Sequence, residues 1–236
     1  MNTARSEIRP GNLPPCPVLE EMYRTGRVRL PDGSTRPASS GISARHAAAL
    51  YRMVLCEKPE LVIETGMGQG FSTLAILCAL AQTGGRLISI DPYEGWESGM
   101  QAALFAVRRA GYAEYHRFIR RRSSEALPFL VAEGTRIQMA YVDGSHRFED
   151  VFIDFYYLDR MLVPGGVIGF NNCGWTDVYR VIRFVQKRRR YRELDAGLAP
   201  DYSARNAFLS LLRRIMRRPR KDRYFRKPFP ETDRAG

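Results

Sequence analysis

The chain has 236 residues, 44% of them hydrophobic, and a formal net charge of +12 at pH 7. A chain of this length can enclose one sizeable core. It contains no stretch of about 18 uninterrupted apolar residues, so we expect no membrane-spanning helix. The opening MNTARSEIRPGNLPPC lacks the apolar centre of a secretory signal. Four scattered cysteines form neither a CxxC pair nor a metal-ligand spacing, so we expect a cytoplasmic protein with reduced thiols.

The positive charge is confined to one part of the chain. Residues 1–179 contain 19 Lys/Arg and 19 Asp/Glu, whereas residues 180–236 contain 18 Lys/Arg and only 6 Asp/Glu. The last quarter therefore carries the whole excess of +12. Such a segment either attracts nucleic acid, anionic lipid or a phosphorylated substrate, or is a solvated basic face without a specific partner.

Predicted strands and helices alternate along most of the chain, after a Pro-, Gly- and Ser-rich beginning with one helical patch near Leu19–Tyr23. Ser43 is expected to cap the first long helix. The expected helices span residues 44–58, 71–83, 98–111, 123–134, 146–162 and 178–188. The expected strands span residues 60–64, 86–91, 114–122, 136–144, 167–172 and 191–195.

This alternation predicts an α/β fold, doubly wound, with a mainly parallel sheet and helices on both faces. The expected organisation is an N-terminal arm (1–40), a main domain (41–200) and a basic C-terminal tail (201–236). Sheets of this kind bind ligands at the carboxyl ends of their strands. The polar strand ends expected along that edge are Glu64–Gly70, Asp91, Asp143–His146 and Asn171–Asn172.

The stretch ETGMGQGFS places a glycine-rich turn directly after the first strand of the main domain. A triphosphate-binding loop would need Gly-Lys-Ser/Thr, but Phe71 follows Gly70. The glycines also miss the dinucleotide spacing GxGxxG by one position. Glu64 would repel a pyrophosphate and attract a cation, while Asp91 suits a ribose diol in either class of ligand. The turn therefore favours a nucleoside that carries positive charge.

These pieces resemble a class I S-adenosylmethionine-dependent methyltransferase, with a Rossmann-like fold, over roughly residues 41–190. The matching segments are VIETGMGQGFSTL, LISIDPYEG, RRSSEALPFL and IQMAYVDGSHRFEDVFIDFYYLDRMLVPGGVIGFNN. The last is similar to the subgroup of macrocin O-methyltransferases and cephalosporin-hydroxylase-like proteins.

The resemblance implies a cofactor-binding role for several positions. The glycines would let the backbone approach the methionine part, Glu64 would lie near its ammonium group directly or through water, and Asp91 would hold the ribose. Ser123 would lie beside the adenine, although it or Ser124 could instead only cap a helix. Asp143 would face the sulfonium and the acceptor. The implied cofactor-binding residues are Glu64, Gly66, Gly68, Gly70, Asp91, Ser123 and Asp143.

Methyl transfer to a hydroxyl needs alignment and a group that removes a proton. Asp143 and His146, in VDGSH, are the expected catalytic residues, although His146 could also be only a polar residue at a helix start. Metal-using relatives carry carboxylates where this chain has Asn171 and Asn172. Because Mg²⁺ prefers anionic oxygens, we expect no tightly held metal.

The expected function is O-methylation of a small hydroxylated acceptor, such as a sugar or natural product. The alternatives are RNA binding or RNA methylation through RRIMRRPRKDRYFRK, where Tyr224 and Phe225 could stack on bases, and a cofactor-binding protein without activity. The sequence also leaves a homo-oligomer open. His46 and His116 are expected to pack or lie at the surface, and Trp96 and Trp175 are expected either beside the acceptor or in the core.

Overall fold

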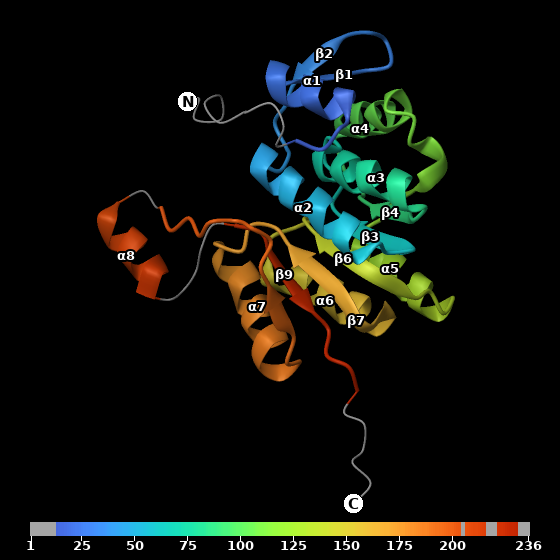
Figure 1. Cartoon of the computed structure of the whole chain (residues 1–236). Helices are drawn as coiled ribbons and strands as arrows, with labels where there is room; N and C mark the ends of the chain where they lie inside the picture. Colours follow the sequence, from blue (N-terminus) through green and yellow to red (C-terminus); the bar gives the residue numbers. More distant parts are fainter. Residues whose placement is uncertain (1–12, 204–205, 216–220, 231–236) are drawn as a thin grey trace, which may run out of the picture.

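A computed structural model describes residues 13–203, 206–215 and 221–230 (Figure 1). Its centre is a seven-stranded sheet with the order β5-β4-β3-β6-β7-β9-β8. The strands are β3 (Leu61–Thr65), β4 (Arg86–Ile90), β5 (His116–Ile119), β6 (Ile137–Val142), β7 (Leu162–Phe170), β8 (Arg192–Leu194) and β9 (Arg223–Arg226). Over the described residues, no helix combines the length and apolar content needed to cross a bilayer.

The five strands from β3 to β7 run parallel, which confirms the expected fold class. Strands β9 and β8 complete the sheet in antiparallel pairings, β9 with β7 and β8 with β9. Since β3 pairs with both β4 and β6, the turns after these three strands lie at one edge of the sheet. The polar strand ends named by the sequence are thereby brought together, as expected of such folds.

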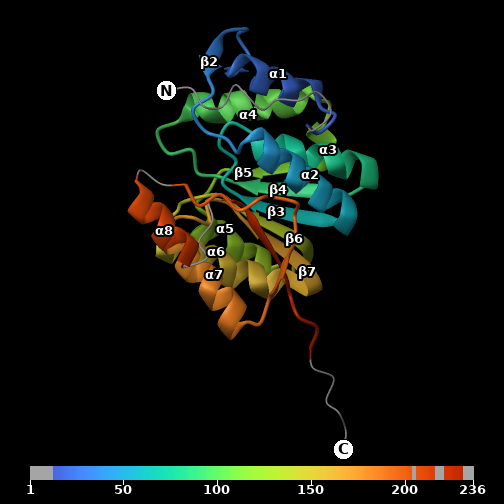
Figure 2. The ribbon, with the colours of Figure 1, turned by 60° about the vertical axis from the view of Figure 1, so that its left-hand side comes forward.

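Helices cover both faces of the sheet (Figures 1 and 2). The helices are α1 (Pro17–Thr25), α2 (Ala44–Glu57), α3 (Phe71–Thr83), α4 (Glu97–Arg109), α5 (Ser123–Ala132), α6 (Phe148–Met161), α7 (Thr176–Arg188) and α8 (Ala207–Ile215), with a short 3₁₀ turn at Ala113–Tyr115. One core lies under α1, α2, α3 and α4, and the other lies under α5, α6 and α7. Ser43 occupies the position before α2 but makes no side-chain capping bond.

Successive residues along a strand of the central sheet pack alternately into the two cores. In β3, Val62 packs in the first core and Ile63 in the second, and in β9 Tyr224 and Phe225 divide in the same way. This follows from the two-residue period of a strand. Burial on both faces explains why the central strands read as continuous apolar runs in the sequence.

The N-terminal residues 13–40 form α1 and a two-stranded sheet of β1 (Arg27–Arg29) and β2 (Thr35–Pro37). Leu19 in α1 is fully buried in the first core. Glu21 accepts hydrogen bonds from Arg29 and Arg109 at 2.8 and 2.6 Å, which ties α1 to both β1 and α4. The described part of the expected arm is therefore packed on the main domain.

The C-terminal region differs most from the sequence-based expectation. Strand β9 comes from the segment expected as a basic tail, yet it lies inside the sheet between β7 and β8. Tyr224 and Phe225 are fully buried there, so their side chains are not available to stack on bases, as the RNA alternative would require. Arg226 binds Glu57 through two hydrogen bonds of 2.8 and 2.7 Å, which places part of the basic charge in the folded structure. Residues 216–220 of the basic run lie outside the described residues.

Candidate functional site

A cavity of about 1510 Å³ lies at the carboxyl ends of β3, β4, β6 and β7. Its other walls include the end of α1, residues 38–43, the start of α2, and Asp201, Ser203 and Lys221 in the C-terminal part of the chain. Of the residues predicted for the site, the structure brings together Gly66, Gly68, Asp91, Ser123, Asp143 and His146 in the cavity lining. Glu64 and Gly70 are not part of this lining.

The glycine turn between β3 and α3 is shaped by positive φ angles. Gly66, Gly68 and Gly70 have φ of 85°, 52° and 88°, a region that side chains with a Cβ rarely adopt. A Cβ on Gly66 would also overlap the backbone carbonyl of Asp143. Gly66 thus permits the turn after β3 to pass directly beside the turn after β6. The glycine spacing is explained by backbone shape, independent of any ligand.

Glu64 lies beneath this turn with no exposed surface. Its Oε2 accepts hydrogen bonds from Thr73 and Ser89 at 2.7 and 2.8 Å. Its Oε1 is buried and has no hydrogen-bond partner among the described residues. Burial raises the pKa of Glu64 to about 7, although hydroxyl groups around it lower the pKa. The sequence analysis expects this carboxylate near the ammonium group of the cofactor, directly or through water, and the structure places it outside the cavity lining.

Asp91, at the end of β4, fixes the glycine turn from the cavity side. Its Oδ2 accepts the backbone N–H groups of Met67 and Gly68 at 2.9 and 3.1 Å. Its Oδ1 accepts the N–H of Tyr93 at 2.9 Å, and the Tyr93 hydroxyl in turn donates to the carbonyl of Gly68. Oδ2 already accepts two hydrogen bonds, whereas Oδ1 accepts one and retains a lone pair for a further donor such as a ribose hydroxyl.

Ser123 is the first residue of α5 and lines the cavity, while Arg122 occupies the capping position and makes no side-chain capping bond. The alternative that Ser123 serves only as the helix cap is therefore not seen. Ser123 lies near the buried Asp154 of α6. Burial raises the pKa of Asp154 to about 6, and the hydroxyls of Ser123 and Thr65 oppose this rise.

Across the cavity, Asp143 and His146 follow β6. His146 Nε2 lies 3.8 Å from Asp143 Oδ1 and 2.7 Å from Asn172 Nδ2. Because an amide nitrogen only donates, Nε2 accepts this bond and the ring proton resides on Nδ1. The His146 ring also packs on Trp175, with ring centroids 4.6 Å apart. The backbone φ of Asn172 is 50°, an unusual value that turns its amide toward His146.

The protonation of these two groups is set by burial. Burial raises the pKa of Asp143 well above its usual value, and the carboxyls of Asp222 and Glu64 add to the rise. Burial lowers the pKa of His146 below its usual value. At neutral pH the imidazole is therefore neutral and can accept a proton.

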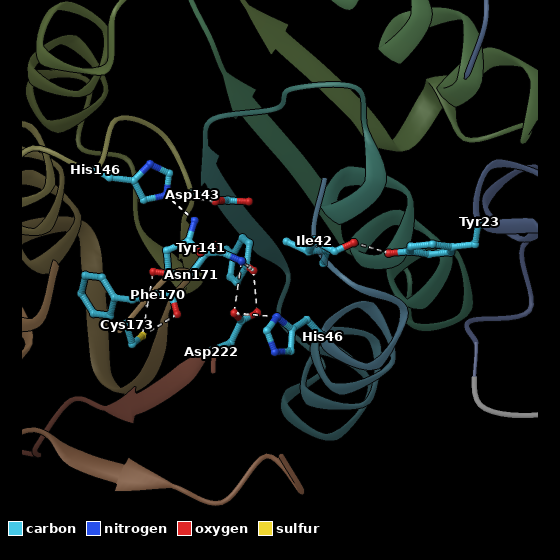
Figure 3. Close-up of polar contacts among 11 residues, drawn as sticks. Tyr23, Ile42, His46, Tyr141, Asp143, His146, Phe170, Asn171, Cys173 and Asp222 are labelled. Atoms are coloured by element: carbon cyan, nitrogen blue, oxygen red, sulfur yellow. Dashed lines mark hydrogen bonds and ion pairs between the residues drawn. The ribbon is translucent and has the colours of Figure 1, made fainter. Parts of the chain in front are cut away.

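A second polar cluster lies behind Asp143, and the sequence analysis missed it (Figure 3). Asp222, just before β9, accepts hydrogen bonds from Tyr141 at 2.8 Å and Asn171 at 3.1 Å. The Nδ1 atom of His46, near the start of α2, lies 3.2 Å from Asp222 Oδ1. Figure 3 shows Asp222 between Asn171 and His46. Asp222 could have been noticed as the one acidic residue in the basic run RRPRKDRYFRK, but nothing in the sequence indicated its partners.

Burial also controls the charges in this cluster. It raises the pKa of Asp222 to about 7, against the opposing influence of the Tyr141 hydroxyl and Arg45. It lowers the pKa of His46 to about 4. A neutral His46 donates from Nδ1 to Asp222, so three donors converge on one buried carboxyl group. The structure therefore uses the Asn171 amide to bind Asp222.

The other predicted side chains fall into two groups. Trp96 and Trp175 both line the cavity, Trp96 before α4 and Trp175 before α7. His116 lies outside the cavity lining, and its Nε2 is 3.0 Å from Ser89 Oγ. Within the described residues, no group of three or more His, Cys, Asp or Glu side chains is arranged to hold a metal ion. The expectation of a metal-free site remains a prediction.

Comparison with known proteins agrees with this arrangement. Residues 63–173 match a family model described as a methyltransferase domain. A flavonoid 3',5'-methyltransferase from Vitis vinifera is 30% identical over 118 residues, which are 48% of this chain and 47% of the relative. The O-methyltransferase hkm8 from Aspergillus hancockii is 27% identical over 126 residues, which are 53% of this chain and 48% of the relative. The chain thus spans about half the length of the curated relatives it matches.

Solved structures share the fold over a larger part of the chain. The O-methyltransferase from Bacillus cereus in complex with SAH has a TM-score of 0.64 and 14% identity, with 90% of each chain covered. The O-methyltransferase TomG from Streptomyces achromogenes in complex with SAM has a TM-score of 0.60 and 16% identity, with 80% of this chain and 82% of the other covered. The chain therefore has the Rossmann-like fold of class I methyltransferases, and residues 63–173 match a methyltransferase domain family.

Proposed function

We propose that the protein is an S-adenosylmethionine-dependent O-methyltransferase that acts on a small hydroxylated acceptor. The observation that carries the proposal is the shared cavity. The glycine turn and Asp91 line it on the β3–β4 side, and Asp143 and His146 line it on the β6–β7 side. A nucleoside ligand and a proton acceptor thus have sites that face the same space.

On the β3–β4 side, Gly66 and Gly68 would allow the methionine part of the cofactor to approach the backbone, with Gly70 completing the turn. Asp91 would receive the ribose hydroxyls while it still binds the amides of Met67 and Gly68. Glu64 would act on the ammonium group from behind the turn, because its carboxylate lies outside the cavity lining. Ser123 would contact the adenine from the start of α5.

Asp143 would respond to the charge of the bound cofactor, whose sulfonium supplies an activated methyl group. Its raised pKa favours the protonated carboxyl more than in an ordinary aspartate. An opposite charge within about 4–6 Å favours the ionised form of a carboxylate. We therefore infer that the sulfonium would lower the pKa of Asp143, and that this carboxyl would bind the charged cofactor more strongly than the uncharged thioether product.

His146 would serve as the base. The acceptor hydroxyl would replace Asn172 at His146 Nε2, which is a lone-pair acceptor in this tautomer. The cofactor would supply the methyl group to the acceptor oxygen and its sulfur would leave as an uncharged thioether, while His146 Nε2 would take the hydroxyl proton. Packing against Trp175 would hold the imidazole in place during this step. Aligning the two reactants supplies a large part of such a rate enhancement.

The acceptor class follows from the lining and the relatives. Trp175 offers an aromatic face that suits a sugar or a planar natural product. One curated relative is named as a flavonoid methyltransferase and the other as an O-methyltransferase. The segment VDGSHRFEDVFIDF supports the finer proposal that the protein belongs to the subgroup that contains macrocin O-methyltransferases and cephalosporin-hydroxylase-like proteins.

The test is transfer of a labelled methyl group from S-adenosylmethionine to a panel of phenols and sugar hydroxyls. His146→Ala should lower kcat by about 100-fold or more, because general base catalysis contributes on this scale. The same variant should bind S-adenosylhomocysteine normally. His116→Ala is the matched control, since that histidine is half-buried and lies outside the cavity lining. Equal activity of wild type and His146→Ala would contradict the assignment of the base.

The same assay separates the remaining alternatives. Activity that persists after chelation and does not rise with Mg²⁺ would support a metal-free site, whereas strict dependence on Mg²⁺ would overturn it. Cofactor binding without transfer to any acceptor would support a protein that binds the cofactor without catalysis. Transfer of the methyl group to RNA, and to none of the small acceptors, would show that RNA is the acceptor.

A further inference from the structure

Helix α8 carries an apolar face that the rest of the described structure leaves uncovered. Phe208, Leu211, Leu212 and Ile215 follow the i, i+3, i+4, i+7 spacing that puts side chains on one face of a helix. They are 67%, 55%, 36% and 68% exposed. Figure 1 shows α8 standing apart from the sheet and from the helices that cover it. Exposed apolar side chains gathered in this way mark an interaction surface.

The charge of the sequence around α8 indicates which kind of partner this face would bind. Between Asp201 and Asp222 the sequence has no acidic residue, and its basic residues there are Arg205, Arg213, Arg214, Arg217, Arg218, Arg220 and Lys221. A second copy of the helix would bring two strongly basic segments together, which is unfavourable. A nucleic acid would satisfy the charges but would leave Phe208 and Ile215 in water. An anionic lipid surface satisfies both, because the apolar face enters the interface while the arginines meet headgroups.

We propose that α8 docks the protein on an anionic membrane surface. In the sequence α8 lies between Ser203 and Lys221, and both of these residues belong to the cavity lining. Lys221 is anchored there by a hydrogen bond of 2.8 Å from Nζ to the carbonyl of Leu198. Docking of α8 therefore brings this side of the cavity close to the lipid surface.

The experiment is flotation of the full chain with phosphatidylcholine vesicles that contain phosphatidylglycerol, compared with pure phosphatidylcholine vesicles. We expect binding to the anionic vesicles that weakens with salt, and much weaker binding to the neutral ones. The double variant Leu211→Asp/Ile215→Asp should lose about tenfold or more in binding. Arg214→Gln should lose about fivefold, the equivalent of roughly 1 kcal/mol for one basic residue near a lipid surface.

The matched control is Phe129→Asp in α5, because Phe129 is also exposed, at 62%, but belongs to another helix. It should change vesicle binding by no more than about twofold. Binding of S-adenosylhomocysteine and the melting temperature should be unchanged in all of these variants, which separates this proposal from the proposed enzymatic function. Absent binding to anionic vesicles, or an equal loss with Phe129→Asp, would overturn the proposal. A wild-type dimer that Leu211→Asp/Ile215→Asp dissociates, or RNA binding insensitive to that variant, would also overturn it.

Discussion

The two sides of the cavity are built in different ways. On the β3–β4 side, the glycine turn and Asp91 lie within one short stretch of chain and are joined by hydrogen bonds from backbone amides to the Asp91 carboxylate. On the β6–β7 side, four side chains meet from distant positions, His46, Tyr141, Asn171 and Asp222. The first side depends on local backbone shape, whereas the second depends on the complete sheet.

This difference has a consequence for mutation. Damage to the β3–β4 side should act mainly on cofactor binding, because Asp91 holds the turn without covering a core. Damage to the β6–β7 side should act mainly on stability, because the buried Asp222 carboxyl accepts hydrogen bonds from the buried Tyr141 and Asn171 side chains. The following predictions test this contrast, beginning with the largest expected effect.

Asp222→Ala should lower the free energy of unfolding by about 3 kcal/mol. The change leaves the buried Tyr141 hydroxyl and Asn171 amide without their acceptor, and each unmet group costs about 1–3 kcal/mol. Urea denaturation measures the loss. S-adenosylhomocysteine binding at low temperature should stay within a few-fold of wild type. A variant as stable as wild type would refute the structural role of the cluster.

Asp91→Ala should weaken S-adenosylhomocysteine binding by about 30-fold, or roughly 2 kcal/mol, since the amides of Met67 and Gly68 and the proposed ribose contact lose one acceptor. Calorimetry measures the change. Asp150→Ala is the control, because Asp150 also lines the cavity but belongs to α6. Equal losses in the two variants would mean that Asp91 contributes only its charge.

Gly66→Ala should be less stable than Gly84→Ala by about 2 kcal/mol. Both glycines have φ of 85°, so the backbone strain of the substitution is the same. A Cβ at Gly84 meets nothing within 4 Å, whereas one at Gly66 overlaps the Asp143 turn, and overpacking costs about 1–3 kcal/mol. Thermal unfolding compares the pair. Similar melting temperatures would show that the two turns separate easily.

The protein without ligand should lose about 1 kcal/mol of stability as the pH rises from 6.5 to 8. The pKa values of Glu64 and Asp222 are raised to about 7, so the folded state holds protons in this window that the unfolded state has already released. Their stabilisation is present at low pH and disappears as the pH passes about 7. His46 and His116 have pKa values lowered to about 4, so their opposite effect ends only when the unfolded state has lost its histidine protons, about one pH unit above 6.5, and it offsets part of this decline.

Melting temperature measured across this range checks the sign. Glu64→Gln should remove about half of the decline, because the amide has no proton to lose in this range and its oxygen can still accept from Thr73 and Ser89. A melting temperature that rises between pH 6.5 and 8 would contradict the assigned burial of the two carboxyls.

The sequence predicted the β3–β4 side well because its signals are local. The strand, the glycines and Asp91 follow one another at fixed spacing, and the parallel fold determines where they meet. It could not predict that Glu64 lies behind the turn, since this depends on Thr73 in α3 and Ser89 in β4. The motif identified the residue but not the direction of its side chain.

The β6–β7 side was predicted only in part. Asp143 and His146 lie in one recognisable segment, but Asp222 belongs to a strand of four residues whose basic surroundings suggested an exposed tail. Burial of Tyr224 and Phe225 depends on their pairing with β7, which is far away in the sequence. Such long-range pairing leaves little pattern in the local sequence. The contact of His46 with Asp222 also depends on this pairing.

The most direct test of the account is a crystal structure of the protein with S-adenosylhomocysteine. We predict that the ribose hydroxyls bind Asp91, that the amino acid part lies over Gly66 and Gly68, and that the sulfur faces Asp143 with His146 across the remaining space. A ligand bound elsewhere, or with its sulfur turned away from Asp143, would contradict the proposal that the two sides of this cavity form one methyltransferase site.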